Sequence, residues 1–358
     1  MKSIALAIPD FRGGGAERVI VLLANRFSYD GYKVTLIVRS AIGPRFEELC
    51  ETITVVELKS QSLVTQAMEV RKICRDKGIY AIVGTLAMAH VVALSKLFGN
   101  KSLVVARLGN TLSLDIARHN KLLRVVHYIY QYCLLFSDKV VFQSQYMKKD
   151  FLTSLHLNDA GSFSVIYNPI EVDIVNSQIN SANDEILDIS KNDIICVGRL
   201  EYQKNYRLTL DLFSKYYSSN HLAKLHILGD GYQKDDLMSY TERLGIKDRV
   251  HFHGYQSNPY KYLVRAGVYL LTSHYEGFSN SLLEAAYLKL PCVVTDVPGG
   301  NREIISHGVN GYVFEPENMS TGFECIRNAF MLERDKNYNY EMFYIENIAR
   351  EYYRLMQC

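Results

Sequence analysis

Two glutamates near the end of the chain lie in a segment that combines groups able to bind sugars with groups able to bind phosphate. Glu276 and Glu284 are eight positions apart between Ser273 and Ala285, a stretch that reads as a strand end, a glycine turn and a helix start. A carboxylate accepts hydrogen bonds from two sugar hydroxyls, and the amides at a helix start attract a phosphate. The segment therefore offers groups for a phosphorylated sugar.

The second of these glutamates also has a purely structural explanation. Ser281 precedes Glu284 by three residues, which is typical of a capping box. In that motif the glutamate closes the N-terminus of its own helix and contacts no ligand. Glu276 lies on the glycine turn, where no comparable local role is indicated.

Two cations follow the strand that opens the second half of the chain. Arg199 stands directly after Val197-Gly198, and Lys204 comes five residues later at the start of the next helix. Arginine offers phosphate a planar set of donors and lysine a mobile charge, so the pair can neutralise a diphosphate without a metal ion. Two solvated charges in a loop are the structural alternative.

A run of glycines follows the first strand. Gly14 and Gly15 belong to the loop from Arg12 to Arg18, which leads into a helix. Glycine lets backbone amides approach a ligand closely, and the helix N-terminus favours an anion there. The loop lacks the Gly-x-Gly-x-x-Gly spacing, and Arg39 rather than an acidic residue follows the second strand, so no nicotinamide site is predicted. A tight turn without a ligand is the alternative.

Short apolar runs alternate with helix-length segments, and this pattern occurs twice. The first series is 3–8, 33–38, 53–57, 80–83, 103–106, 139–142 and 164–166; the second is 193–197, 225–228, 249–252, 268–271, 292–295 and 311–314. Such alternation predicts parallel sheets covered by helices, with ligands at the carboxyl ends of the strands. We therefore expect an α/β chain of two doubly wound, Rossmann-like domains facing a cleft. The expected boundaries are a first domain at 1–168, a linker at 169–190, a second domain at 191–339 and a final helix at 340–358 that packs back on the first domain.

Length and composition set the class of protein. The 358 residues are 48% hydrophobic and 22% charged, which indicates a packed globular chain of more than one domain. The 7 cysteines have no paired spacing, so neither a zinc site nor a disulfide framework is predicted, and the cytoplasm is the expected compartment. Pro9 and Asp10 interrupt the short apolar start before a signal peptide could form, and no membrane span is predicted.

Charge is distributed unevenly along the chain. Residues 1–170 hold 21 Lys and Arg against 13 Asp and Glu, a net charge of +8, whereas residues 171–358 carry −6. Residues 116–136 read as one helix with basic groups at its start and aromatic and aliphatic groups after them, which suits a lipid headgroup boundary. An ordinary amphipathic surface helix explains the same pattern equally well. No nucleic-acid recognition motif accompanies the basic residues.

Taken in order, these motifs resemble the retaining family-4 glycosyltransferases of the GT-B fold, over about residues 1–357. The resemblance rests on the GGGAER loop, VGRL-x3-KN, the Gly229-Asp230-Gly231 turn, FHGY at 252–255, the EGFSNSLLEA frame, Pro298-Gly299-Gly300-x-x-Glu303 and the Asn310-Gly311 turn. It implies catalytic roles for Arg199 and Lys204 at the nucleotide diphosphate and for Glu276 at the donor sugar.

The resemblance also implies a set of substrate-binding residues. Glu284 would hold the ribose hydroxyls, and the amides of Gly277, Phe278 and Ser279 would join Glu276 at the sugar. Leu282 and Leu283 would offer amides to the distal phosphate, Gly14 and Gly15 would approach it from the opposite wall, and His253 to Tyr255 would lie beside the base; Gly229 completes the set. No metal ligands and no cofactor are implied, and the nucleotide sugar, by family habit UDP-linked, enters as substrate.

One position departs from the family pattern. Many relatives carry a histidine after the fifth strand of the first domain, where this chain has Arg107 and, a little further on, Asn110, either of which is expected to take that contact. His90 and His119 are other candidates, although a lone histidine in an apolar helix is more often structural. No general base is assigned, and the resemblance favours a front-face displacement in which the leaving phosphate helps to deprotonate the acceptor.

The expected activity is transfer of a hexose or N-acetylhexosamine from a nucleotide sugar to a lipid-linked glycan. The expected partners are the donor, a lipid-linked oligosaccharide and, through the basic first half, an anionic membrane at its cytoplasmic face. O-antigen, capsule or another bacterial glycan is the expected product. A sugar-nucleotide epimerase of related fold and a non-catalytic partner of a transferase are the alternatives. Intact Arg199, Lys204, Glu276 and Glu284 argue against a non-catalytic relative.

Overall fold

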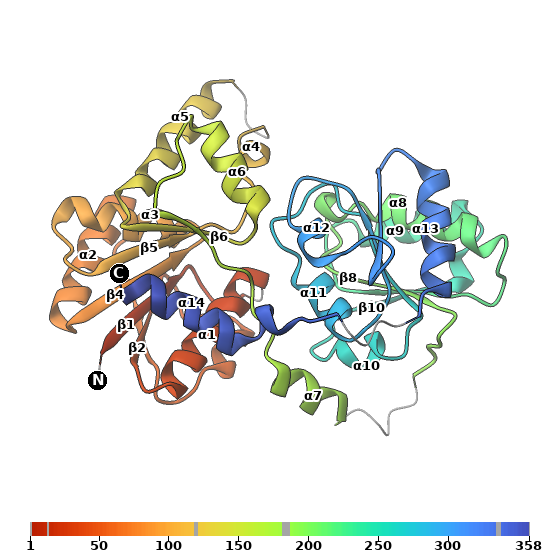
Figure 1. Cartoon of the computed structure of the whole chain (residues 1–358), viewed down its shortest axis with the longest axis horizontal. Coiled ribbons are helices and arrows are strands. Elements are labelled where there is room, and N and C mark those ends of the chain that lie inside the picture. Colours follow the sequence, from red (N-terminus) through yellow and green to blue (C-terminus); the bar gives the residue numbers. More distant parts are fainter. Residues whose placement is uncertain (1, 13, 118–120, 181–186, 334–337, 358) are drawn as a thin grey trace. The chain divides into compact units, whose positions relative to one another are not determined.

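The chain folds into two compact units, each built on its own parallel sheet (Figure 1). The computed structural model describes residues 2–12, 14–117, 121–180, 187–333 and 338–357. One unit contains Met1–Pro169 and Glu341–Cys358, and the other contains Ile170–Tyr340. This is the doubly wound α/β architecture that the strand and helix alternation predicts.

The first unit has a seven-stranded parallel sheet of order β3-β2-β1-β4-β5-β6-β7. Its strands are β1 (Ser3–Ile8), β2 (Lys33–Val38), β3 (Thr54–Glu57), β4 (Ile79–Thr85), β5 (Leu103–Arg107), β6 (Lys139–Phe142) and β7 (Phe163–Val165). The strand order reverses beside β1, between β1 and β4, and such a reversal opens a crevice at the carboxyl ends of the strands.

Side chains along β1 alternate between two buried faces of that sheet. Ile4, Leu6 and Ile8 join the core under α1 (Gly15–Tyr29) and α14 (Ile345–Gln357), whereas Ala5 and Ala7 join the core under α2 (Leu63–Asp76) and α3 (Ala87–Ser95). Both faces are apolar because helices cover both. The small alanines on one face leave room for the buried side chains of α2 and α3.

The regular helix expected over 116–136 ends earlier than expected. The structure has α4 (Leu112–Ala117), α5 (Lys121–Tyr132) and the 3₁₀ turn η3 (Cys133–Phe136), and residues 118–120 lie outside the described residues. The predicted end of the helix at Phe136 was therefore wrong, because the regular helix ends at Tyr132. Tertiary packing explains the end of the regular helix, because Leu134 in η3 is buried in a core with Leu112 of α4 while its neighbours Leu135 and Phe136 stay exposed.

The C-terminal helix α14 lies against α1 within the first unit (Figure 1). Its apolar stripe places Tyr352 against Phe27, with ring centroids 6.1 Å apart, and Arg26 forms an ion pair with Glu346 at 2.7 Å. A short 3₁₀ turn, η6 (Glu341–Phe343), precedes it, and the remaining helices of the unit are α6 (Gln145–Ser154), η1 (Pro44–Glu48) and η2 (Lys96–Phe98).

The second unit has a six-stranded parallel sheet of order β10-β9-β8-β11-β12-β13. Its strands are β8 (Ile194–Val197), β9 (Leu225–Leu228), β10 (Val250–Gly254), β11 (Val268–Leu271), β12 (Cys292–Thr295) and β13 (Gly311–Phe314). Order reverses between β8 and β11, so the loops after these two strands flank the crevice where a ligand is expected.

Helices cover both faces of the second sheet as well. They are α8 (Tyr206–Tyr217), α9 (Lys234–Arg243), α10 (Tyr260–Leu263), α11 (Asn280–Tyr287), α12 (Asn301–Ile304) and α13 (Met319–Met331), with the 3₁₀ turns η4 (Tyr202–Lys204) and η5 (Lys247–Arg249). The stretch expected as a linker at 169–190 contains a further helix, α7 (Val172–Asn180), which packs against α10. Its apolar face, with Val175 buried, gives it a place in the second unit.

Candidate functional site

The loop after β8 directs one of its two cations inward and the other outward. Lys204 is at the end of η4, where Asn205 takes a left-handed backbone (φ 48°) and starts α8. Gly198 lies under the lysine, because a Cβ there would be 3.1 Å from Lys204 Cε. The side chain of Arg199 is 68% exposed and pairs with Glu201 at 3.2 Å. Lys204 is therefore the cation that the fold itself positions.

Lys204 and Glu276 meet directly across the β8 and β11 loops. Lys204 Nζ donates to Glu276 Oε1 at 2.6 Å, and the side chains are only 15% and 5% exposed. The hydroxyl of Ser273, wholly buried, donates to the same oxygen at 2.5 Å. Low exposure weakens the screening of this pair by water. The structure thus joins two of the three residues expected to be catalytic, and sequence reasoning had not included Ser273.

The loop after β11 is fastened to the loop after β8. Thr272 Oγ1 donates to the carbonyl of Asn205 at 3.0 Å, and the amide of His274 donates to the carbonyl of Gln203 at 2.8 Å. The ring of His274 stacks on that of Tyr202, with centroids 4.5 Å apart, and burial lowers the pKa of His274. These bonds fix the distance between the strand ends that carry Lys204 and Glu276.

The glycine turn after Glu276 is held from the other side by the β12 loop. The amide of Glu276 donates to the carbonyl of Pro298 at 3.0 Å, and the amide of Gly300 donates to the carbonyl of Gly277 at 2.9 Å. Gly299 needs its positive φ of 139°, and a Cβ there would come within 2.0 Å of the Glu276 carbonyl oxygen. The side chain of Phe278 is buried. The backbone of Glu276 to Phe278 is consequently rigid.

The start of α11 is capped by Ser279. Its hydroxyl accepts the amide of Leu282 at 3.4 Å, and its carbonyl accepts the amide of Leu283 at 3.0 Å. Ser281, which the capping-box alternative required as the cap, donates instead to the carbonyl of Val197 at 3.1 Å. A phosphate that binds the Leu282 amide would have to share or replace the bond to Ser279.

Glu284 faces α10 instead of its own helix start. The hydroxyl of Tyr260 donates to Glu284 Oε1 at 3.1 Å, and both side chains are buried. The capping-box explanation of Glu284 was therefore wrong. Tyr260 was absent from the sequence-based set, and the Asn258-Pro259 turn before it was the local pattern that could have drawn attention to it.

The β9 and β10 ends supply the remaining residues expected in this unit. Gly229, with φ 138°, lies so close to β8 that a Cβ would be 1.9 Å from the Gly198 carbonyl oxygen. His253 turns inward: its Nε2 is 3.0 Å from His226 Nδ1, and burial with the neighbouring His226 and His251 lowers its pKa to about 4. Tyr255 is 65% exposed. Of this pair, Tyr255 is the one whose side chain is open to a ligand.

Gly14, Gly15, Arg107 and Asn110 belong to the first unit. Gly14 is the N-cap of α1, and a Cβ there would lie 2.2 Å from Glu17 Oε2. Gly15 and Asn110 are exposed. Gly14, Gly15 and Asn110 follow the carboxyl ends of β1 and β5, where a crevice is expected.

Arg107 is wholly buried at the end of β5. Its guanidinium donates to Asn168 Oδ1 at 2.5 Å and to Thr85 Oγ1 at 3.3 Å, and burial lowers its pKa. This placement gives Arg107 a structural role and does not present it to a substrate. His90 is also buried, stacked on Tyr130 with centroids 3.7 Å apart, while His119 lies outside the described residues.

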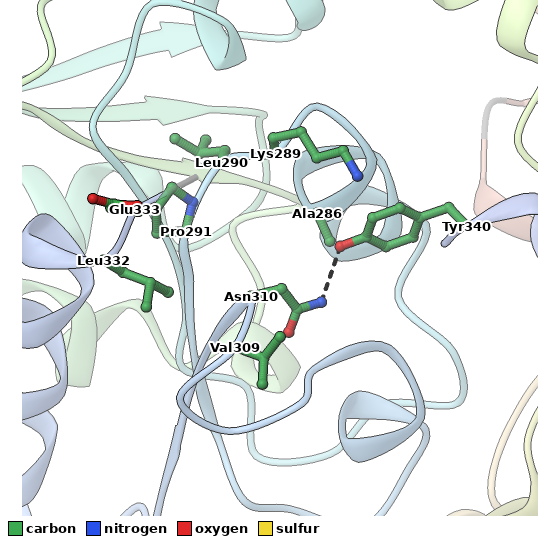
Figure 2. Close-up of a pocket in the computed structure, with 9 residues that line it drawn as sticks. All are labelled: Ala286, Lys289, Leu290, Pro291, Val309, Asn310, Leu332, Glu333 and Tyr340. Carbon is green, nitrogen blue, oxygen red and sulfur yellow. Dashed lines mark hydrogen bonds between the residues drawn. The ribbon is translucent and has the colours of Figure 1, made fainter. Parts of the chain in front are cut away.

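A small hollow in the second unit is lined by none of the residues expected in the site (Figure 2). Leu290 and Pro291 line it just before β12, and Asn310, which donates to the Tyr340 hydroxyl at 2.9 Å, lines it just before β13. These positions are at the amino ends of the strands. In doubly wound sheets ligands bind at the opposite, carboxyl ends, so this hollow is not a candidate for the same ligand.

In the described part of the chain, the His, Cys, Asp and Glu side chains form no group of three or more that could hold a metal ion. The helices described there include none that is long and apolar enough to cross a bilayer.

Two doubly wound units, each with a strand-order reversal in its parallel sheet, make up the GT-B fold. Residues 13–174 match the family described as Glycosyltransferase Family 4, and residues 179–338 match Glycosyl transferases group 1. The chain belongs to these glycosyltransferases.

Three relatives illustrate the similarity. The N-acetylgalactosamine-N,N'-diacetylbacillosaminyl-diphospho-undecaprenol 4-alpha-N-acetylgalactosaminyltransferase of Campylobacter jejuni is 27% identical over 94% of this chain and 92% of its own length. The lipopolysaccharide 1,6-galactosyltransferase of Salmonella typhimurium is 33% identical over 44% of this chain and 43% of its own length. The structure of Anabaena Alr3699/HepE in complex with UDP covers 100% of both chains, with a TM-score of 0.80 at 20% identity, and so supports the fold.

Proposed function

We propose that the protein transfers a hexose or N-acetylhexosamine from a nucleotide sugar, UDP-linked, to a lipid-linked glycan during assembly of a bacterial O-antigen, capsule or related polysaccharide. The observation that carries this proposal is the Lys204–Glu276 pair at the strand reversal of the second unit. It brings a phosphate-binding cation within 2.6 Å of a carboxylate suited to sugar hydroxyls. The relative from Campylobacter jejuni, whose name specifies a diphospho-undecaprenol acceptor, supports the choice of acceptor.

The roles of the side chains follow from their charge and exposure. Arg199, which is exposed, and Lys204, which is held in the site, bind the two phosphates of the donor. Glu276 accepts hydroxyls of the transferred sugar, and Glu284 accepts those of the ribose. Negative charge that develops on the leaving diphosphate is stabilised by cations already in place. Transfer proceeds on the front face with retention of configuration and without a metal ion, the leaving phosphate taking the acceptor proton.

A donor must first displace the internal ion pair. Before the donor binds, Lys204 is neutralised by Glu276. A diphosphate draws the ammonium group toward itself, and the released carboxylate oxygen can then accept a sugar hydroxyl. Donor binding therefore prepares both residues together, and a diphosphate alone engages only one of them.

The experiment is a transfer assay with a synthetic undecaprenyl-diphosphate-linked sugar, in the presence of EDTA. UDP-hexoses and UDP-N-acetylhexosamines are tested as donors, and NMR assigns the anomeric configuration of the product. Glu276→Ala is expected to abolish turnover and leave UDP affinity within about twofold, whereas Lys204→Ala lowers both by about tenfold or more. Equal loss of UDP binding in the two variants contradicts these roles. Absence of transfer from every one of these UDP-sugars refutes the proposed function.

We further propose that α5 and η3 bring the first unit to an anionic membrane at its cytoplasmic face. Apolar side chains recur along this segment with large exposed fractions: Val126 56%, Ile129 64%, Tyr132 42%, Leu135 37% and Phe136 44%. Arg124 on the same helix is exposed, and residues 1–170 carry a charge of +8. Apolar groups beside cations favour a lipid headgroup boundary.

Vesicle co-sedimentation tests this surface. Wild type is expected to bind vesicles of phosphatidylethanolamine and phosphatidylglycerol at low salt and to be released at high salt. Ile129→Glu is expected to weaken binding by about tenfold, because it places a charge in the apolar stripe. Leu222→Glu, at a site that is 74% exposed in the second unit, is the control. No binding by wild type, or equal loss in the two variants, contradicts the assignment.

A further inference from the structure

A buried tyrosine determines where the carboxylate of Glu284 lies. The Tyr260 hydroxyl donates to Glu284 Oε1 at 3.1 Å; Tyr260 is 1% exposed and Glu284 6%. Tyr260 begins α10, which follows the β10 loop, whereas Glu284 lies on α11 after β11. The hydrogen bond therefore connects the segment that follows β10 with the segment that follows β11.

The tyrosine is itself fixed by its neighbours. Its amide donates to Asn258 Oδ1 at 3.2 Å, and Asn258 Nδ2 donates to the carbonyl of Gln178 in α7 at 2.7 Å. Pro259 restricts the backbone between the two residues. A series of bonds thus runs from α7 through Asn258 and Tyr260 to the carboxylate.

A glutamate side chain has three rotatable bonds, and a ligand that binds it must order all of them. One bond from a rigid, buried hydroxyl holds one carboxylate oxygen and restricts the rotation of the group. A carboxylate held in this way is prepared for a vicinal diol, whose two hydroxyls need both oxygens in a fixed plane.

We propose that Tyr260 is a positioning residue, which orients Glu284 to accept the 2′- and 3′-hydroxyls of a nucleotide ribose. The inference rests on the proposed function, because that function places the ribose at Glu284. It adds a residue with no contact to the ligand, and it predicts that the hydroxyl of Tyr260 and the 2′-hydroxyl of the nucleotide are energetically coupled.

The test is a double comparison of variant and ligand by isothermal titration. UDP and 2′-deoxy-UDP are titrated into wild type, Tyr260→Phe, Glu284→Gln and Tyr262→Phe. Tyr262 is the matched control, since it lies on the same short helix, is buried, and donates to Gln256 Oε1 at 3.3 Å instead of to Glu284. Melting of each variant without ligand reports any change in stability separately.

The expected result is a loss of discrimination between ribose and deoxyribose. Wild type is expected to prefer UDP about tenfold, the order of one hydrogen bond to a carboxylate. Tyr260→Phe is expected to bind UDP about fivefold more weakly and to retain only about a twofold preference. Tyr262→Phe retains the wild-type preference. A tyrosine that only supports packing would lower stability and leave this ratio unchanged.

Failure of the inference and failure of the function give different results. If Tyr260→Phe keeps the wild-type preference while Glu284→Gln loses it, Tyr260 does not position the carboxylate and the function stands. Equal loss in Tyr262→Phe likewise overturns the specific role. If Glu284→Gln keeps the preference, the ribose is not at Glu284. If wild type does not bind UDP, the proposed transfer from a UDP-linked sugar fails, and this inference with it.

Discussion

The Lys204–Glu276 ion pair can be removed by a substitution at either residue, and the two substitutions are expected to lower stability by unequal amounts. Lys204→Met removes the ammonium group from a carboxylate that is 5% exposed, whereas Glu276→Gln removes the charge beside a lysine that is 15% exposed. The first change is expected to lower the free energy of unfolding by about 3 kcal/mol and the second by about 1 kcal/mol.

The magnitudes follow from what each variant leaves behind. Removing one partner of a buried ion pair costs about 3–5 kcal/mol, since the other charge stays buried without it. The lower end applies to Lys204→Met because Ser273 still donates to Glu276 at 2.5 Å. In Glu276→Gln the amide oxygen can still accept these hydrogen bonds, and the more exposed lysine gains hydration, so that the cost is about that of one hydrogen bond, 1 kcal/mol.

Calorimetric melting at neutral pH measures both variants and the double variant. For a unit of this size about 1 kcal/mol corresponds to about 2–4 °C, so that Lys204→Met is expected to lower Tm by about 8 °C and Glu276→Gln by about 3 °C. The double variant is expected to resemble Glu276→Gln, because the buried charge is gone. The coupling energy of the cycle is then about 3 kcal/mol.

Two results would refute this reasoning. A double variant that is less stable than Lys204→Met shows that the two costs add, and that the pair is not coupled. Equal destabilisation by the two single variants shows that the difference in exposure does not control the cost of each unpaired charge. Arg199→Met is the control, since its side chain is 68% exposed, and it is expected to change Tm by less than about 2 °C.

Two further perturbations test the helix start and a buried histidine. Ser279→Ala removes the N-cap of α11 and is expected to lower the free energy of unfolding by about 1 kcal/mol, which is measured as a lower Tm. Ser281→Ala leaves the hydrogen bond from the Leu282 amide to Ser279 intact. If Ser281→Ala raises the exchange rate of the Leu282 amide more than Ser279→Ala does, the capping assignment is contradicted. Burial lowers the pKa of His90 from 6.5 to about 4, so the unfolded chain binds the extra proton first and stability is lost as pH falls from about 6.5 to 4. His90→Phe is expected to reduce the change of the unfolding free energy over that pH range by about 3 kcal/mol. An unchanged pH dependence in His90→Phe shows that this histidine does not titrate as its burial requires.

Local patterns were sufficient to predict the sheets. Apolar runs of three to six residues between helical segments predict buried parallel strands, because helices on both faces exclude water from both sides of each strand. The run from Ser3 to Ile8 became β1, and the run at 80–83 became β4 with one additional residue before it and two after it. Helix ends were less predictable, since α5 gives way to a 3₁₀ turn after Tyr132, where Leu134 is buried, and no periodicity within that segment indicates it.

The types of residues and their order along the chain were sufficient to indicate where the candidate site lies. The family resemblance predicted which cations and carboxylates of the second unit belong to the site: Arg199, Lys204, Glu276 and Glu284. A strand order that reverses between β8 and β11 explains why residues 72 positions apart are bonded, as Lys204 and Glu276 are. The sequence indicated that Lys204 and Glu276 both face a ligand. Only the fold showed that they form an ion pair with each other.

The direction and partner of each side chain were decided by tertiary structure. Arg107 was expected at a substrate and is buried against Thr85 and Asn168, because the packed end of the first sheet encloses it. Glu284 matched a capping box by spacing, yet its carboxylate bonds to Tyr260, since Ser279 already caps the helix. Sequence spacing specifies which groups can meet along one element, whereas contacts between elements depend on packing across the sheet, and that is where Tyr260 and Ser273 join the site.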